Sequence, residues 1–415
     1  MLQEVVKSKQ AVCILGSDSL PYGRLATVVR FFSRAGLRHD PRSLPIANAS
    51  GLFSTMLAWQ WQRNGTTFSA RNDHSYFDLL FSASSLSASD PRDKLYALLD
   101  ISLHEDEWLP LPNYALPPPQ VFRDFAVLDL TRNKSMRALS WAYLLEPGEQ
   151  PPREFPSWTP DFSRTRIPII SYHNLFHRHR AGGNLPVAVD IESSGSILTL
   201  RGRMAGTVQR LCKTKKQHYL DADVEPSTGT YSPAAIKAEA NWLDDCHSAM
   251  VGVELHGLYT LMDSMALTGR TSESYATFIR ALCCGVNQAT LEPLNNQTVS
   301  AIEVHLLELK GFAEGVMHAS DTWDDDTVYR RCVADSPTGH MRFCYLDNGR
   351  MGWVPGGAEV GDVVFIFDGA AGPHALRGPT EDGTYLWVGE GWIQGLMDGE
   401  ILEDAAIACE RVRIR

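Results

Sequence analysis

The sequence predicts an α+β protein, with mainly helical N-terminal and middle regions packed on a small antiparallel β-barrel or sandwich at the C-terminus. Two patterns predict this class: apolar residues three and four apart in the first two regions, and short apolar runs between Gly, Pro, Asn or Asp in the last. The chain has 415 residues, of which 44% are hydrophobic, enough for two or three packed modules. We expect a helical region over 1–165, a mixed strand and helical region over 166–330 and a small antiparallel β module over 331–415.

The first region is expected to contain one strand and several helices. Residues 11–15 alternate as a strand does, and residues 21–35 carry apolar side chains at helical spacing. In "SASDPRDKLYALLDIS", Asp90 stands where an N-cap belongs, Pro91 follows at the first helical position, and Asp93 lies in the first turn, where the helix dipole favours acids. We therefore interpret this stretch as a helix start rather than a catalytic cluster. "QVFRDFAVLDLTRN" predicts a second helix.

The middle region predicts a strand followed by helices. "SILTLRGRMAGTVQRL" alternates over a long span, which indicates a strand pair or one bent strand. Helices are expected over 232–263, 271–284 and 297–318. In the last region, Asn348-Gly349 in "LDNGRMGWV" is a strong hairpin-turn signal.

Composition narrows the classes of partner. The net charge of -11 argues against general nucleic-acid binding, which needs basic surfaces. No stretch approaches the ~18 uncharged apolar residues of a membrane helix, and the first residues do not form a signal peptide. The eight cysteines form no CxxC pair, which is typical of free thiols in a reducing cytoplasm. We expect a cytoplasmic protein without nucleic-acid or membrane partners.

No cofactor or metal is predicted. The sequence holds no nucleophile elbow, no nucleotide-binding glycine loop and no HExxH. Asp244 and Asp245 near His247, and the run Asp324–Asp326, could hold Mg²⁺ through carboxylates, but no basic residues for phosphates lie beside them. A solvated helix face and a polar loop are the simpler interpretations.

The stretch "SYHNLFHRHR" has the densest group of titratable and aromatic side chains. His173 and His177 are four apart and would share a face of a helix. Such a pair can bind a metal or act as acid and base near neutral pH, and the alternative is an ordinary surface segment. With Tyr172 and Asp161, these histidines form the candidate catalytic set.

Aromatic residues and a few polar neighbours form the candidate substrate-binding set. Most of the aromatics are expected in the core, but some could line an apolar pocket between modules, where small-molecule sites commonly lie. The polar members would orient a ligand by hydrogen bonds. The set is Trp141, Trp158, Trp353, Arg377, Tyr385, Glu390 and Trp392.

Several stretches resemble the second half of fungal heterokaryon-incompatibility (HET) domain proteins. They are "DPRDKLYALLDI", "LPNYALPPPQVFRDFA" and "FPSWTPDFS", with "GWVPGGAEVGDVVFIFDGAAGPHALR" and "YLWVGEGWIQGLMDGEIL" resembling the family's small C-terminal module. The likeness is patchy through 165–330. The family's N-terminal TIR-like half, with motifs of the type "YVWG" and "DAICINQ", has no counterpart here, so the resemblance implies a chain without its signalling half.

Two functions follow from this resemblance. In the first, the scaffold is repurposed to bind a small apolar metabolite and acts as a cofactor-independent enzyme of secondary metabolism, for a cyclisation, a cycloaddition such as a Diels–Alder-type reaction, a dehydration or an isomerisation. In the second, the chain is a non-enzymatic regulator or adaptor in heterokaryon incompatibility or immune-like signalling. Either function allows a homo-oligomer. A degenerate gene product is a third interpretation, against which the capped helices and coherent strand pattern argue.

Overall fold

A computed structural model gives the structure of the protein, which divides into two compact units. The first joins Met1–Leu128 to Asp161–Ile167, and the second joins Asp129–Pro160 to Pro168–Arg415. The division into three sequence regions stays a prediction. The described residues are 8, 10–25, 27–28, 76–84, 86–99, 109–144, 146–149, 155–164, 179–192, 195–224, 233–251, 273–285, 293–313 and 340–415.

The first unit contains a β-hairpin. β1 (Val12–Leu15) pairs antiparallel with β2 (Asp18–Pro21), which confirms the strand expected at 11–15. Residues 22–25 are helical and begin the helix expected over 21–35.

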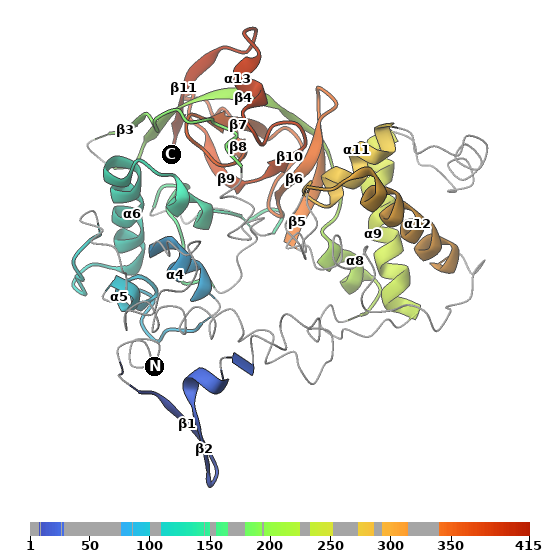
Figure 1. Cartoon of the computed structure of the whole chain (residues 1–415). Helices are drawn as coiled ribbons and strands as arrows, with labels where there is room; N and C mark the ends of the chain where they lie inside the picture. The colour runs from blue at the N-terminus through green and yellow to red at the C-terminus, as the bar shows by residue number, and fades with distance from the viewer. Residues whose placement is uncertain are drawn as a thin grey trace. The chain divides into compact units, whose positions relative to one another are not determined.

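Three helices make up the rest of the described first unit. Their aromatic side chains pack on Phe125, whose ring centroid lies 5.6 Å from that of Tyr76 and 5.4 Å from that of Phe162. Two of the helices confirm the predictions from "DPRDKLYALL" and "QVFRDFAVL". The helices are α4 (Tyr76–Ser82), α5 (Asp93–Leu99) and α6 (Pro118–Leu128), drawn in blue to teal in Figure 1.

The second unit is built on one antiparallel sheet of nine strands. Hydrogen bonding gives the order β10-β6-β5-β4-β7-β8-β9, and β3 and β11 also pair with β4. The hairpin expected at Asn348-Gly349 is confirmed between β5 and β6. The strands are β3 (Val189–Ile191), β4 (Leu198–Leu211), β5 (Met341–Leu346), β6 (Met351–Pro355), β7 (Val363–Phe367), β8 (His374–Arg377), β9 (Leu386–Glu390), β10 (Trp392–Ile393) and β11 (Cys409–Ile414).

β4 is a single bent strand that reaches four partners. Its register with β7 shifts between Met204 and Gly206, and its register with β5 shifts between Val208 and Arg210. Such bulges bend and twist a strand. Along the first half of β4, β11 pairs with one edge, and β3 and then β7 pair with the other. The last residues of β4 pair with β5. Of the two interpretations of "SILTLRGRMAGTVQRL", the bent strand is confirmed.

The sheet curves around a core of small apolar side chains without closing into a barrel in the described residues. Leu144 joins the two ends of the curve: its N–H donates to the Val388 carbonyl oxygen at 2.9 Å, and its own carbonyl oxygen accepts from the Gly357 N–H at 3.0 Å. The antiparallel sheet expected at the C-terminus is therefore confirmed, with β3 and β4 of the middle region as further members, but a strand-closed barrel is not. The interior side chains include Ala205, Val208, Cys344, Val354, Val364, Ile366, Ala375 and Val388.

Helices cover the outer face of β5 and β6 (Figure 1). Trp353 of β6 stacks on Trp242, with ring centroids 6.1 Å apart, and donates its Nε1–H to the Ala281 carbonyl oxygen at 2.9 Å. The three predicted middle helices are confirmed where they are described. The helices of this unit are α8 (Lys215–Asp221), α9 (Pro233–Val251), α11 (Glu273–Leu282), α12 (Asn296–Ala313), α13 (Glu400–Glu403), the π-helix η2 (Asp129–Asn133) and the 3₁₀-helix η3 (Arg137–Trp141).

Gly352→Ala tests the pairing of β6 with β10. A Cβ at position 352 would lie 2.0 Å from the Trp392 carbonyl oxygen, so the two strands would have to separate. We expect the free energy of unfolding, measured by urea denaturation, to fall by more than about 3 kcal/mol. Gly349→Ala is the control, because its Cβ meets no atom within 4 Å, and its positive φ of 81° should cost only about 1 kcal/mol. Equal losses in both variants would contradict this pairing.

Candidate functional site

The outer face of β8 and β9 brings a glutamate and a histidine together. Glu390, the last residue of β9, pairs directly with His374, the first residue of β8. The neighbouring Ala375 belongs to the interior core, and successive side chains of a strand alternate between faces. His374 and its cross-strand partner Glu390 therefore share the outer face.

Glu390 is a buried carboxyl with an unusual proton affinity. Its exposed fraction is 9%, and burial raises its pKa to about 7. The Ser140 hydroxyl donates to Oε2 at 2.6 Å, which lowers the pKa and partly offsets the effect of burial. At neutral pH the carboxyl therefore exists in both protonation states. A group of this kind can give and take a proton at physiological pH.

His374 supplies a neutral imidazole beside this carboxyl. It is 2% exposed, and burial lowers its pKa to about 3. Its ring centroid lies 4.8 Å from that of Trp387 and 5.5 Å from that of Phe367. Its Nδ1 has no hydrogen-bond partner among the described residues. The face thus offers a polar nitrogen in an aromatic setting.

The segment 155–160 is attached to the same strand. The Ser157 hydroxyl accepts from the Trp387 N–H at 2.8 Å and donates to the Arg415 carbonyl oxygen. Next to Ser157, the buried Trp158 Nε1 and Thr159 Oγ1 find no partner in the described part of the chain. Buried polar atoms without partners are rare, and a bound water molecule or ligand is one way to satisfy them.

Two buried acids fix the short helix η3 that presents Ser140. Asp129 is fully buried and accepts from the Ala138 N–H at 2.9 Å and from Asn133 Nδ2 at 2.8 Å. Burial raises the pKa of Asp129 to about 6. Asp129 thus holds the first turn of η3, and Glu390 holds its next-to-last residue. The position of the Ser140 hydroxyl is set from both sides.

The predicted catalytic set is only partly located. Tyr172, His173 and His177 lie outside the described residues. Asp161 is half-buried and belongs to a local turn: it accepts from the Ser163 N–H at 3.1 Å and pairs with Arg164 at 3.2 Å. A proton-transfer role for these four residues stays a prediction.

The predicted pocket walls fall into two groups. Trp353 and Trp392 belong to the apolar cluster under α9, α11 and α12. Trp141 ends η3, beside Ser140, and Trp158 lies in the segment that Ser157 ties to β9. The second group lies on the segments that contact β9 through Ser140 and Ser157.

Two polar members of the predicted set have structural partners. Arg377 donates to Asp362 at 2.9 Å and to the Gly357 carbonyl oxygen at 2.7 Å, which fixes the connection between β6 and β7. The Tyr385 ring packs edge-on against Phe365, with centroids 5.6 Å apart. Glu390 is the member with the strongest case for a ligand. The sequence did not point to His374, Ser140 or Ser157, since each depends on a strand register or loop contact that spacing does not reveal.

The acidic cluster on α9 has a structural partner. Asp245 accepts from the Lys213 N–H at 2.7 Å and lies 3.2 Å from His218 Nε2, which ties α8 to α9. Within the described ranges no group of three or more His, Cys, Asp or Glu side chains could hold a metal ion. The run Asp324–Asp326 lies outside these ranges.

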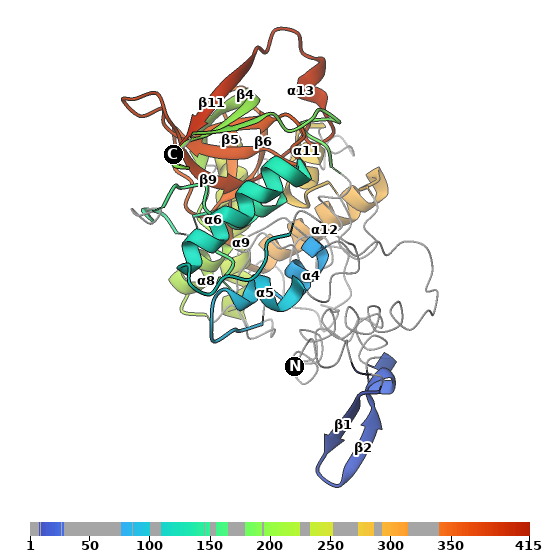
Figure 2. The same ribbon diagram turned by 90° about the vertical axis from the view of Figure 1, so that its left-hand side faces the viewer.

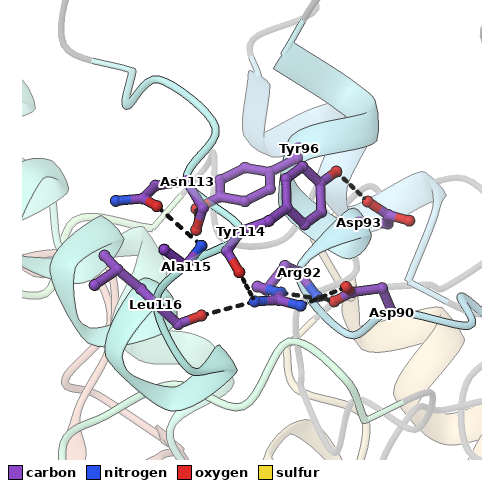
Figure 3. Close-up of polar contacts among 8 residues, drawn as sticks. All are labelled: Asp90, Arg92, Asp93, Tyr96, Asn113, Tyr114, Ala115 and Leu116. Atoms are coloured by element: carbon purple, nitrogen blue, oxygen red, sulfur yellow. Dashed lines mark hydrogen bonds and ion pairs between the residues drawn. The ribbon is translucent and has the colours of Figure 1, made fainter.

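The "DPRDK" stretch forms a dense polar cluster in the first unit (Figure 3). The Arg92 guanidinium bonds Asp90 through Nε at 2.9 Å and through Nη2 at 2.7 Å, and its Nη1 donates to the carbonyl oxygens of Tyr114 and Leu116 at 2.6 and 2.8 Å. The Tyr114 hydroxyl in turn donates to Asp93 at 2.5 Å. Since Arg92 is committed to these bonds, the cluster ties the start of α5 to the loop before α6.

The start of α5 differs slightly from the prediction. The Asp90 carboxylate accepts from the Arg92 N–H at 2.9 Å, two residues on, so it closes a turn before the helix begins at Asp93. Asp90 therefore caps the turn that precedes α5, rather than the first residues of the helix itself. Lys94 is buried, with its ammonium donating to the carbonyl oxygens of Ser84 and Leu86.

Two comparisons with known proteins found similarities. The model of the Het-6 β-barrel domain matches residues 259–408. "Heterokaryon incompatibility protein 6, OR allele" of Neurospora crassa is 22% identical to the chain over 385 residues, which cover 80% of this chain and 52% of that protein. The chain is thus similar to heterokaryon-incompatibility proteins, over its C-terminal part by the domain model and over most of its length by this relative. It spans about half the length of this relative.

The match to the Het-6 β-barrel domain bears on the sequence analysis and on the candidate site. It confirms the resemblance inferred from the sequence, and it covers β5–β10, which include Glu390 and His374, but not β4 or β11. No solved structure matches the chain. In the part of the chain that the structure describes, no helix is both long and apolar enough to cross a membrane.

Glu390→Gln should change how stability depends on pH. The folded-state pKa of about 7 exceeds the ordinary value of 4.5, so the proton binds the folded state more tightly. This stabilisation is complete below about pH 4.5 and is lost as the pH rises to about 7. We expect wild type to lose up to about 3 kcal/mol from this group over that interval, and E390Q to lack this loss. Urea denaturation across the interval measures it.

The control for this experiment is Glu146→Gln, which removes a carboxyl that is 58% exposed. It should follow the wild-type pH profile. The same slope in wild type and E390Q would show that Glu390 titrates normally.

Arg92→Ala should lower the melting temperature by several degrees, because it leaves the Tyr114 and Leu116 carbonyl oxygens without their guanidinium donor. Arg92→Lys keeps the charge but not the fork and should recover only part of the loss. Arg123→Ala on α6 is the matched control, since Arg123 bonds its neighbour Asp124. Thermal melts in which R92A and R123A coincide would contradict the role of the cluster.

Proposed function

We propose that this chain acts in the cytoplasm on a small, mainly apolar metabolite bound at the outer face of β8 and β9, as a cofactor-independent enzyme. The observation that carries the proposal is the pairing of Glu390, with a pKa of about 7, with a neutral His374 whose Nδ1 has no described partner. The Trp387 and Phe367 rings beside His374 suit an apolar ligand.

The chemistry available to this site is acid–base chemistry. Protonated Glu390 can donate to an oxygen or nitrogen of the ligand, and ionised Glu390 can accept a proton from carbon or oxygen. Ser140 orients the carboxyl, and neutral His374 can accept or donate one hydrogen bond according to its tautomer.

These groups suit a cyclisation, a cycloaddition of the Diels–Alder type, a dehydration or an isomerisation. Such reactions gain much of their acceleration from orientation, which can supply about 7–11 kcal/mol in favourable cases. The aromatic rings would hold the apolar body of the metabolite, while the polar groups act at one end.

A second candidate function follows from the comparisons. The Het-6 β-barrel match and the relative named as a heterokaryon incompatibility protein favour a regulator or adaptor in incompatibility or immune-like signalling. In that case Glu390 and Asp129 would serve only to hold η3 in place. The chain would then act through a protein partner rather than on a metabolite.

Metabolite capture with a matched variant distinguishes the two functions. Wild type, E390Q and the E146Q control are incubated with a metabolite extract of the source organism, and bound and converted species are read by mass spectrometry. We expect a retained or converted apolar species with wild type and E146Q, and conversion reduced about 10²-fold or more with E390Q, as is typical of losing an acid–base group. Capture that is identical in E390Q would reject this site. Absence of any retained molecule, with a larger family member co-purifying instead, would favour the adaptor.

A further inference from the structure

One face of the strands β3, β4 and β11 is rich in arginine. Arg201 and Arg203 stand two apart on β4, and Arg411 and Arg413 stand two apart on β11. Alternate residues of a strand share a face, and the register pairs Arg411 with Arg201, so all four side chains project from the same side. β11 and β4 lie side by side in both views (Figures 1 and 2). We call these four residues the arginine face.

The arginine face carries a local electrostatic cost. Arg411 and Arg201 are directly opposite each other, and like charges in that position destabilise a sheet. Their side chains are 66% and 55% exposed, and that of Arg413 is 49% exposed. Because these side chains point outward, packing of the fold does not require them to be charged. A binding role would account for the four arginines.

The acids on this face leave it positive. Asp190 pairs with Arg411 and Glu192 with Arg413, both at 3.0 Å and both largely exposed. Exposed pairs of this kind contribute little and exchange readily with water or another anion. The buried Asp368 holds Arg203 at 3.0 Å and Arg201 at 3.6 Å. Three carboxylates thus pair with the four guanidiniums of the arginine face, which leaves the face with an excess of positive charge. The net charge of the whole chain is -11.

We propose that the arginine face binds an extended acidic segment of a partner protein, whose carboxylates take the place of Asp190 and Glu192 on Arg411 and Arg413. A guanidinium presents a planar fork that matches a carboxylate in a bidentate pair. Recognition of acidic motifs by clustered arginines is a recurring mode of peptide binding. A carboxylate partner is favoured over the phosphates of a nucleic acid, because Arg411 and Arg413 already hold carboxylates in this structure. The proposal rests on strands other than those that carry Glu390.

Peptide binding to the full chain tests this proposal. The probe is a dye-labelled peptide of about eight glutamates, read by fluorescence anisotropy at about 0.05 M and about 0.5 M salt, because exposed ion pairs weaken with screening. We expect binding at low salt, its loss at high salt, and at least about tenfold weaker binding to Arg201→Ala/Arg411→Ala. Arg411→Lys/Arg413→Lys keeps the charge without the fork and should give an intermediate affinity.

The control is Lys213→Ala, which removes a 59% exposed ammonium paired with Asp221, beyond the far end of β4. Its affinity for the peptide should stay within about twofold of wild type. Melting curves check folding, because R201A/R411A removes a like-charge pair and also the contacts of Arg201 with Asp368 and of Arg411 with Asp190. Equal binding by wild type and R201A/R411A, or tighter binding of a single-stranded DNA of the same charge, would overturn the proposal.

Discussion

The pairing of β4 on both of its edges is the constraint on which the second unit depends. β5 and β11 occupy one edge and β3 and β7 the other, and the two register shifts along β4 let one strand serve four neighbours. β4 comes from the middle of the sequence, whereas β5–β11 follow more than a hundred residues later. The family match to residues 259–408 omits it. A fragment cut at those boundaries would leave the edges of β5 and β7 unpaired, which is the condition under which sheets associate wrongly.

The two ends of this sheet differ in what covers their outer faces: an apolar core lies over β5 and β6, and the candidate site lies over β8 and β9. On β5 and β6 the outward residues are aromatic and meet helices, so Trp242, Phe343 and Trp353 form an apolar layer. On β8 and β9 the outward residues include His374 and Glu390, and the covering elements are η3 and the segment 155–160. On β8 and β9 the covering elements therefore enclose Glu390 among aromatic rings, and this burial raises the pKa of its carboxyl.

Local sequence patterns predicted more of the fold than of the candidate site. The Asp-Pro-Arg-Asp run, the alternating stretch that became β4 and the Asn-Gly turn all act through neighbours in the chain, so their outcomes could be predicted. Glu390 was predicted for its residue type, but its partners Ser140 and His374 were not, because they are 250 residues away in one case and depend on the β8–β9 register in the other. The roles of Arg377 and Tyr385 were missed for the same reason: ion pairs and ring contacts follow from tertiary structure.

The contact that Leu144 makes between β9 and the end of β6 has a consequence for local opening of the fold. β9 is joined to the end of β6 by the backbone of Leu144, with one hydrogen bond to each side, while β10, which follows β9 after one residue, pairs directly with β6. Segments held by so few hydrogen bonds open more often than the ladders around them, and such local opening leaves the rest of the fold intact. Val388, which Leu144 bonds, lies two residues from Glu390. Local opening at Leu144 would therefore reach the strand that carries the buried carboxyl before it disturbed the strands that β4 keeps in register.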